Sequence, residues 1–357
     1  MEIPKIEEEK FLKGRGAQIN PFNPFHDNNY VQEHIEGLDE EMITPRETLF
    51  FTDFPKNALN KVESPDSGMM YSINPYQGCE HGCVYCYARN SHNYWGFSAG
   101  LDFETRIIVK PNAPQLLEKV FLNKNWNPYP IHISGNTDCY QPIERKMKIT
   151  RTILEVCLKY KNPAGMLTKN QLIVRDIDIL GELAKERLIH TLLSVTALDE
   201  NIRLKLEPRT ATYKARLKTM EKLAQNGIPV GVMIGPIIPG LTDHFLPDIM
   251  KAAADHGAHT AVFTMLRLNG AIAQIFTDWI YKTFPDHADR VLSNVKAVHN
   301  GKLNDSRWGK RKRGDGELAF AIQQMFYLMK EKYMGHYPPF AFNLKAFRRP
   351  GQMQLEL

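Results

Sequence analysis

The sequence predicts an α/β fold built on a parallel sheet. Between about residues 69 and 265, six short runs rich in branched aliphatic residues alternate with longer segments of helical periodicity. Strands separated by helices of that length are typical of βαβ units, whose crossovers are right-handed. Six such units can curl into a partial barrel, although the pattern alone equally allows a doubly wound sheet. In either fold, ligands bind at the carboxyl ends of the strands.

The expected strands are short and apolar. They lie at residues 69–73, 131–134, 165–169, 189–195, 230–234 and 261–265, and a further strand-like run occupies 106–109. The expected helices lie at residues 114–122, 149–161, 175–187, 212–227 and 242–256. Pro114 suits the first turn of a helix, and Gly227 suits a helix end.

Two flanking regions surround this core, which is expected to occupy residues 67–270. Residues 1–66 are turn-rich and carry 14 acidic against 7 basic side chains, so we expect an irregular N-terminal extension. It is expected to wrap part of the core because its phenylalanines need burial. These phenylalanines are Phe22, Phe25, Phe50, Phe51 and Phe54. Residues 271–357 are expected to form a mostly helical C-terminal segment.

The C-terminal segment combines two expected apolar clusters with a basic loop. The clusters are Trp279, Ile280 and Phe284, and then Phe320, Ile322, Met325, Phe326 and Met329. Between them, residues 310–313 are four consecutive basic side chains, Lys310 to Arg313, beside glycines. Such a loop can hold phosphate groups, but a charge run is more often a solvated loop, and charge alone does not decide between these interpretations.

The bulk of the sequence argues against a membrane protein. No apolar run approaches membrane-spanning length, and the first residues include an acid rather than a basic leader. Thiols that are not committed to disulfides fit a reducing compartment. We therefore expect a cytoplasmic location and no membrane partner.

The strongest chemical signal is the stretch 78–86, called the cysteine loop below. Cys79, Cys83 and Cys86 lie within eight residues, and Gly78 and Gly82 allow the chain to curl and direct several sulfurs inward. A tight curl of thiolates suits a soft metal or an iron–sulfur cluster. Three thiolates on a four-iron cube leave one iron without a protein ligand, and that iron is available for chemistry.

A structural zinc site is the first alternative for these cysteines. It usually needs four ligands in two pairs, whereas Cys139 and Cys157 are isolated and His81 and His92 lack the usual spacing. A disulfide framework is disfavoured by the odd count of 5 cysteines and by their short spacings. Two other functions stay open: a zinc or iron–sulfur module that binds nucleic acid without radical chemistry, and a pure electron-transfer protein.

The spacing C-x3-C-x-aromatic-C, formed by Cys79, Cys83, Tyr85 and Cys86, resembles that of the radical S-adenosylmethionine (SAM) superfamily. The wider stretch 74–89 is similar to the spore-photoproduct-lyase-like branch and, within it, to an uncharacterised bacterial subfamily of radical SAM proteins. The resemblance covers about residues 70–270 and implies a partial TIM-like (β/α)6 barrel, the radical SAM core. It implies a [4Fe-4S] cluster on the three cysteines, with SAM chelating the fourth iron. Reductive cleavage of SAM then gives a 5′-deoxyadenosyl radical that abstracts hydrogen from an unknown substrate.

The same resemblance implies SAM contacts from residues near the strand ends. Tyr85 would pack near the adenine, and Thr137 with Asp138 would replace the Gly-Gly-Glu that many members have and this chain lacks. The other implied contacts are Lys169, Ser194, Arg216, Gly235 and Ile238. Each has a plainer interpretation: a packed aromatic ring, a turn cap, a solvated lysine, a surface arginine pair or a strand-to-helix turn.

The catalytic residue and the substrate are not determined by the sequence. Cys139 is a weak candidate for a hydrogen-atom donor. The resemblance matches a Ser-Asp pair of the lyase to Thr137 and Asp138, which places the lyase's donor cysteine near Gly135, so a buried thiol is the favoured interpretation of Cys139. The branch and the basic C-terminal segment make a nucleic acid or nucleotide the expected substrate class. The radical chemistry also implies an external electron donor such as flavodoxin or ferredoxin.

Overall fold

The computed structural model describes residues 12–25, 47–66, 68 and 70–349. Its main sheet has seven strands in the order β10-β9-β8-β7-β6-β3-β2, of which all but β2 are parallel. The strands are β2 (Leu59–Lys61), β3 (Tyr71–Ile73), β6 (Ile131–Ile133), β7 (Ala164–Thr168), β8 (Ile189–Ser194), β9 (Val230–Ile237) and β10 (Thr260–Met265). The parallel strands follow chain order without a reversal. The sheet is therefore singly wound, which confirms the partial (β/α)6 barrel and rules out the doubly wound alternative.

The six predicted strands correspond to β3 and β6 to β10, with boundaries within three residues. The run at 106–109 is also a strand, β5 (Arg106–Val109), but it lies outside the barrel. It pairs with β1 (Leu49–Thr52) and β4 (Tyr76–Gln77) in a separate three-stranded sheet. Periodicity predicts a strand from its local sequence and carries no information about the sheet that the strand joins.

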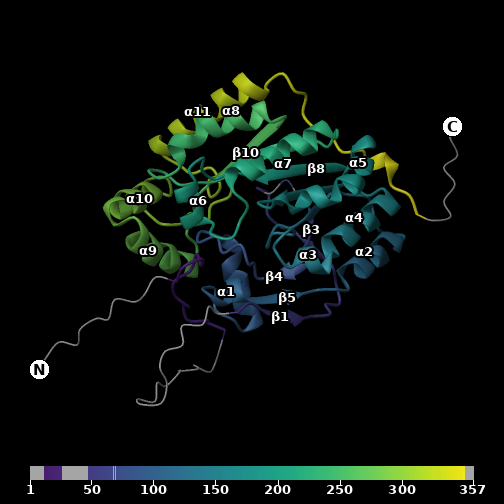
Figure 1. Ribbon diagram of the computed structural model, residues 1–357, viewed down its shortest axis with the longest axis horizontal. Helices are drawn as coiled ribbons and strands as arrows, with labels where there is room; N and C mark the ends of the chain where they lie inside the picture. Colours follow the sequence, from purple (N-terminus) through teal and green to yellow (C-terminus); the bar gives the residue numbers. More distant parts are fainter. Residues whose placement is uncertain (1–11, 26–46, 67, 69, 350–357) are drawn as a thin grey trace, which may run out of the picture.

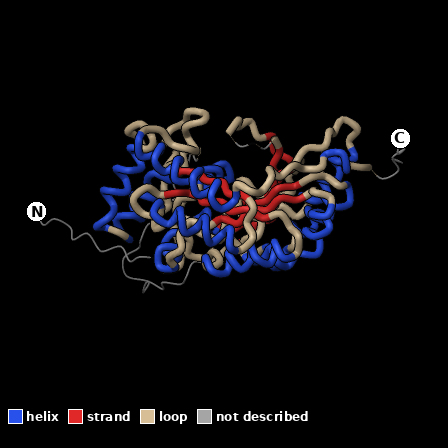
Figure 2. Tube along the Cα trace, turned by 90° about the horizontal axis from the view of Figure 1, so that it is seen from above, coloured by secondary structure: helices blue, strands red, loops and turns tan. Residues whose placement is uncertain are grey.

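Helices between the barrel strands pack on the sheet and form the main core. They are α2 (Ala113–Leu122), α4 (Ile149–Tyr160), α5 (Ile177–Lys185), α7 (Tyr213–Gln225) and α8 (Leu246–Asp255). Shorter helices are η1 (Tyr87–Trp95), α1 (Asp102–Thr105), α3 (Glu144–Met147), η2 (Gln171–Asp176), α6 (Glu200–Leu206) and η3 (Asp243–Phe245). The side chain of Thr212 caps α7 by accepting a hydrogen bond from the amide of Ala215. In Figure 2 the helices gather along one side of the strands and at the ends of the sheet.

The C-terminal segment is mostly helical, as predicted. Helices α9 (Ala271–Thr283) and α10 (Pro285–Ala297) lie side by side at the left of Figure 1 and form a second hydrophobic core. That core buries Trp279 and Ile280, as predicted, and it also contains Cys83, Val84 and Tyr85 of the cysteine loop. The C-terminal helices therefore pack directly on the loop.

The predicted apolar cluster on α11 (Glu317–Met334) was wrong in part. Ile322 and Phe326 are buried against α8 and β10, whereas Phe320 and Met325 are 62% and 42% exposed. One face of the helix is therefore apolar and partly solvent-facing. After α11 the chain returns across the amino-terminal ends of the strands and includes η4 (Leu344–Ala346). There the amides of Asn343 and Arg348 donate to the carbonyls of Arg187 and Tyr160.

The expected burial of the N-terminal phenylalanines was also wrong. The exposed fractions of Phe22, Phe25, Phe50, Phe51 and Phe54 are 64%, 60%, 48%, 38% and 68%. Two of these rings pack on other aromatic rings at the surface, Phe25 on Tyr94 and Phe51 on Phe97. The N-terminal extension nevertheless contributes to the interior through small residues, because Ala17 is fully buried.

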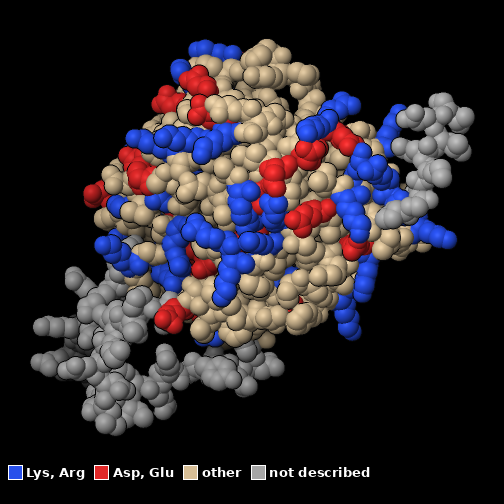
Figure 3. All heavy atoms as spheres, turned by 45° about the vertical axis from the view of Figure 1, so that its right-hand side comes forward, with Lys and Arg blue, Asp and Glu red and all other residues tan. Residues whose placement is uncertain are grey.

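Charged side chains of both signs are interspersed on the face shown in Figure 3. The basic excess of the C-terminal segment is accordingly neutralised in part by local carboxylates. Arg307 pairs with Asp305, and Lys310 pairs with Asp315 at 2.8 Å. Among the described helices, none is both long enough and apolar enough to cross a membrane.

Candidate active site

The cysteine loop lies between β4 and η1, beside the carboxyl ends of the barrel strands, a region called the barrel mouth below. Gly78 and Gly82 have φ angles of 79° and 69°, the left-handed conformation that favours glycine, as the predicted curl requires. A Cβ atom at Gly82 would lie 2.7 Å from the Glu104 carboxylate. The curl therefore depends on glycine for both backbone conformation and space.

The three thiols of the loop influence one another electrostatically. Cys79 and Cys83 are buried and Cys86 is half-buried. Burial raises the pKa of Cys83 to about 12, although the nearby Lys169 ammonium opposes the shift. Burial also raises the pKa of Cys79, and the proximity of Cys83 and Cys86 adds to that increase. Three neighbouring thiols that resist ionisation on their own suit a multivalent cationic group, which compensates the charge of thiolates.

This donor set fits an iron–sulfur cluster better than a zinc ion. Among the described residues, no three His, Cys, Asp or Glu side chains converge closely enough to hold one metal ion. A closed zinc site needs four such ligands at one point, whereas a cubane bonds each thiolate to a different iron and so separates its ligands more widely.

A buried ion pair holds the backbone of the cysteine loop. The Arg89 Nη2 atom lies 2.6 Å from the Glu104 Oε1 atom, and both side chains are fully buried. The same guanidinium donates to the Cys83 carbonyl from Nε at 3.0 Å and from Nη2 at 2.9 Å. Arg89 therefore fixes the middle cysteine through its main chain, and Glu104 supplies the compensating charge.

Residues 12–25, called the N-terminal strap below, close the outer side of the loop. The amides of Gly16 and Ala17 donate to the two Glu104 carboxylate oxygens at 3.2 and 2.8 Å. A Cβ atom at Gly16 would lie 1.7 Å from the carbonyl oxygen of Gly82, so only glycine fits there. The N-terminal extension thus belongs to the site, which sequence patterns did not reveal.

A second buried carboxylate, Glu207, lies on the inner side of the loop. It accepts hydrogen bonds from the Tyr85 hydroxyl and, at 2.6 Å, from Thr196 Oγ1. Arg216 donates to the same carboxylate and, at 2.9 Å, to the Ser194 carbonyl. Burial opposes ionisation of Glu207, but Arg216 and Lys169 outweigh it and lower its pKa to about 2. Tyr85 and Arg216 are thereby fixed as parts of one charged network, and their contact with SAM stays a prediction.

Three other predicted SAM contacts meet in a row across neighbouring strand ends. The Lys169 Nζ atom, at the end of β7, donates to Ser194 Oγ, at the end of β8, at 3.0 Å. Ser194 Oγ in turn donates to the Gly235 carbonyl of β9 at 3.2 Å. The Lys169 ammonium also lies 5.8 Å from the centre of the Tyr85 ring. Ile238 is buried just beyond β9, and its amide is bonded to Thr242.

Asp138 connects the ends of β6 and β7 with the cysteine loop. Its carboxylate accepts from Thr168 Oγ1 at 2.7 Å and from the Lys169 amide at 2.8 Å, and it lies 3.3 Å from His81 Nδ1. Burial alone would raise the pKa of Asp138, but His81 and these donors lower it to about 2. The hydroxyl of Thr137 donates to the Tyr76 carbonyl at 2.8 Å. Both residues have protein partners, and their contact with SAM stays a prediction.

Cys139 packs into the main hydrophobic core. Its side chain is fully buried, and burial raises the pKa of its thiol. Its amide donates a hydrogen bond to Ser134 Oγ at 3.1 Å, and its carbonyl accepts one from Thr150 Oγ1 at 2.6 Å. These contacts favour the buried-thiol interpretation, and a hydrogen-donor role stays a prediction.

Sequence reasoning missed the two carboxylates that organise this site, Glu104 and Glu207. Each lies directly after a buried apolar residue, Phe103 and Leu206, in a short helix or at its end. A carboxylate within an apolar stretch is the one local signal that could have revealed them. Their partners, however, are set by tertiary contacts.

Comparison with known proteins identifies the family of the chain. A sequence profile of the radical SAM superfamily matches residues 73–253. An uncharacterised protein of Mycobacterium tuberculosis is 30% identical over 240 residues, which cover 66% of this chain and 70% of that protein. An uncharacterised protein of Methanocaldococcus jannaschii is 31% identical over 242 residues, which cover 68% of this chain and 86% of that protein.

Solved structures of spore photoproduct lyase share the fold. The enzyme complexed with dinucleoside spore photoproduct has a TM-score of 0.62 at 15% identity, with 84% of this chain and 85% of that chain covered. A mutant of that lyase with bound AdoMet and the same dinucleoside gives a TM-score of 0.61 at 15% identity, with the same coverage of 84% and 85%. At this identity the likeness establishes the fold alone.

Proposed function

This chain belongs to the radical SAM superfamily and is an enzyme, and from that premise we propose that Cys79, Cys83 and Cys86 hold a [4Fe-4S] cluster. The observation that carries the proposal is the placement of three thiols, two buried and one half-buried, in a glycine-bent loop at the barrel mouth. When bound and reduced, such a cluster supplies the electron for cleavage of SAM to methionine and a 5′-deoxyadenosyl radical.

The residues of the chain would bind and orient SAM beside that cluster. The row formed by Lys169, Ser194 and Gly235 presents an ammonium, a hydroxyl and a carbonyl at neighbouring strand ends. Lys169 suits the SAM carboxylate, because an ammonium and a carboxylate form a charge-assisted hydrogen bond. Asp138 suits the SAM amino group for the same reason, and its low pKa keeps it ionised at neutral pH. Burial around this row excludes water from a reactive radical.

We assign the substrate to the nucleic acids or nucleotides, the class suggested by the branch and by the basic C-terminal segment. Spore photoproduct lyase, whose fold this chain shares, is solved in complex with dinucleoside spore photoproduct. An external donor such as flavodoxin or ferredoxin would supply the electron. The location that fits an oxygen-sensitive cluster is the reducing cytoplasm.

Anaerobic reconstitution tests the proposal. The protein is loaded with iron and sulfide, reduced with dithionite in the presence of SAM, and assayed for 5′-deoxyadenosine by mass spectrometry. We expect about four irons per chain and formation of that product, both lost in Cys83→Ala. Cys157→Ala is the matched control, because that thiol is buried in the main core away from the loop. One zinc per chain, or a full cluster without the nucleoside product, would reject the proposal.

A further inference from the structure

The basic run at 310–313 lies at the barrel mouth, although it is far from the cysteine loop in the sequence. The carbonyl of Lys312 accepts a hydrogen bond from the amide of Met265, the last residue of β10, at 2.8 Å. The loop is therefore anchored at the end of the last barrel strand. The Lys312 ammonium is close enough to His132 of β6 that it adds to the lowering of the His132 pKa by burial, to about 4. The Lys312 ammonium also donates to the carbonyl of Asp66, in the connection between β2 and β3, so it reaches from the end of β10 to the opposite side of the sheet.

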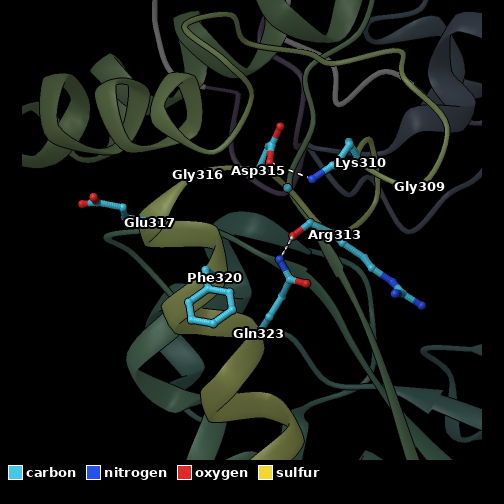
Figure 4. Close-up of a pocket in the computed structure, with 9 residues that line it drawn as sticks. Gly309, Lys310, Arg313, Asp315, Gly316, Glu317, Phe320 and Gln323 are labelled. Carbon is cyan, nitrogen blue, oxygen red and sulfur yellow. Dashed lines mark hydrogen bonds and ion pairs between the residues drawn. The ribbon is translucent and has the colours of Figure 1, made fainter.

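The four basic side chains of this run have different partners. Lys310 pairs with Asp315, and the Arg311 Nε atom lies 2.8 Å from the Asp66 carboxylate, with its guanidinium 3.6 Å from the centre of the Trp308 ring. Lys312 donates only to a neutral group among the described residues, the Asp66 carbonyl, at 3.1 Å. Figure 4 shows the Arg313 side chain pointing away from the Lys310–Asp315 pair. Lys312 is therefore the half-buried member of the run that has no carboxylate partner in the described chain.

Arg267 lies two residues beyond Met265, whose amide is bonded to Lys312, and it also lacks a carboxylate partner within ion-pair distance among the described residues. It follows β10 by two residues, is half-buried, and makes no hydrogen bond or ion pair with any described residue. Burial and the neighbouring Arg311 guanidinium lower the pKa of Arg267. A half-buried guanidinium without a counter-ion is costly unless a ligand supplies the negative charge.

The connection after β10 is fixed against the helix that follows the cysteines. The Asn90 side chain, on η1, donates to the Asn269 carbonyl at 2.8 Å and accepts from the Ala271 amide at 3.1 Å. The connection that carries Arg267 therefore lies beside η1, the helix that follows the cysteine loop, at the carboxyl ends of the strands, where substrates bind in this fold.

We propose that Arg267 and Lys312 bind a phosphate group of the substrate at the barrel mouth. The oxygens of a phosphate point in several directions, so one phosphate can contact both cations together. The two oxygens of a carboxylate, in contrast, are matched by a single guanidinium. This inference rests on the proposed function, because it assigns the substrate class of the same site. Asp66, which forms its ion pair with Arg311, is one carboxylate near the three cations Arg267, Arg311 and Lys312, so a net positive charge is left for the ligand.

Calorimetric titration of the anaerobically reconstituted protein with bound SAM tests this assignment. The probes are inorganic phosphate, uridine 5′-monophosphate, uridine and a single-stranded uridine hexanucleotide. We expect the monophosphate to bind and uridine to fail, and we expect Arg267→Gln and Lys312→Gln each to weaken monophosphate binding at least about tenfold. Arg313→Gln, which removes an exposed charge from the same loop, should stay within about twofold of the parent protein. Far-UV circular dichroism and the thermal midpoint show that each variant is folded.

The outcomes separate this assignment from the proposed function. Tighter binding of the hexanucleotide than of the monophosphate supports a polynucleotide substrate, and equal binding supports a small phosphate ester. Monophosphate binding that ignores both substitutions overturns the assignment, as does equal binding of monophosphate and uridine. If 5′-deoxyadenosine never forms while binding still depends on Arg267, the radical function fails and the phosphate site stands. If the nucleoside forms but binding is independent of Arg267, the phosphate site alone fails.

Discussion

Substitution of Glu104 by glutamine tests whether one buried carboxylate holds the cysteine loop. The side chain is fully buried, 2.6 Å from Arg89, and accepts from the amides of Gly16 and Ala17. Glutamine keeps the shape and removes the charge, so the Arg89 guanidinium stays buried without its counter-ion. Removing one partner of such a pair costs about 3–5 kcal/mol. With an m-value of about 3 kcal/mol/M, the urea midpoint should fall by roughly 1 M or more.

The assay is urea unfolding of the cluster-free protein under reducing conditions, followed by tryptophan fluorescence. Asp178→Asn is the control, because Asp178 forms an ion pair with Arg151 but is 62% exposed. Loss of an exposed pair costs about 0–1 kcal/mol. After reconstitution, Glu104→Gln should also hold less iron than the control. A midpoint for Glu104→Gln that matches the control would refute the clamp, and so would unchanged iron content.

Three further predictions concern the strap, the SAM row and a buried histidine. Gly16→Ala should lower the iron content severalfold, because the added Cβ would lie 1.7 Å from the Gly82 carbonyl oxygen. Gly181→Ala is the control, because the space around Gly181 is open, and equal iron content in the two variants would contradict the prediction. Lys169→Met should weaken SAM binding, measured by calorimetry, about tenfold or more, whereas the control Lys185→Met, on an exposed helical face, should not. An unchanged Kd for Lys169→Met would argue against a SAM contact by Lys169. Burial lowers the pKa of His92 to about 4 from an ordinary 6.5, so the unfolded chain takes up a proton that the folded chain refuses. The free energy of unfolding, measured with urea, should therefore fall by roughly 3 kcal/mol as the pH drops from 6.5 to 4. His92→Phe should make the dependence of this free energy on pH less steep, and an equally steep dependence in the variant would contradict the prediction.

The barrel could be predicted from the sequence because its elements are local. Each strand is a short apolar run followed by a polar turn, and each helix has its own period and caps, as Thr212 and Gly227 show for α7. The same reasoning placed Lys169, Ser194 and Gly235 at strand ends, and they form one row because residues that end neighbouring parallel strands share one edge. Their contact with a ligand depends on a molecule that the chain does not encode.

The enclosure of the cysteine loop could not be predicted because it depends on distant partners. Arg89 and Glu104 are separated by 15 residues, and Gly16 meets Glu104 across 88 residues, with no shared periodicity. The N-terminal phenylalanines were expected to be the buried part of the extension, but two small residues, Gly16 and Ala17, fill that role. Hydrophobicity predicts that a side chain favours burial, and close backbone contact between glycines leaves no such signal.

The cysteine loop is enclosed by segments from both halves of the polypeptide. Gly16 seals it from one side, and α9 and α10 pack against Cys83 and Tyr85 from the other. Loss of either segment should therefore weaken the ability of the protein to keep a metal centre. Iron retention after limited proteolysis becomes a reporter of whether the two halves are still associated, even where the peptide bond between them has been cut.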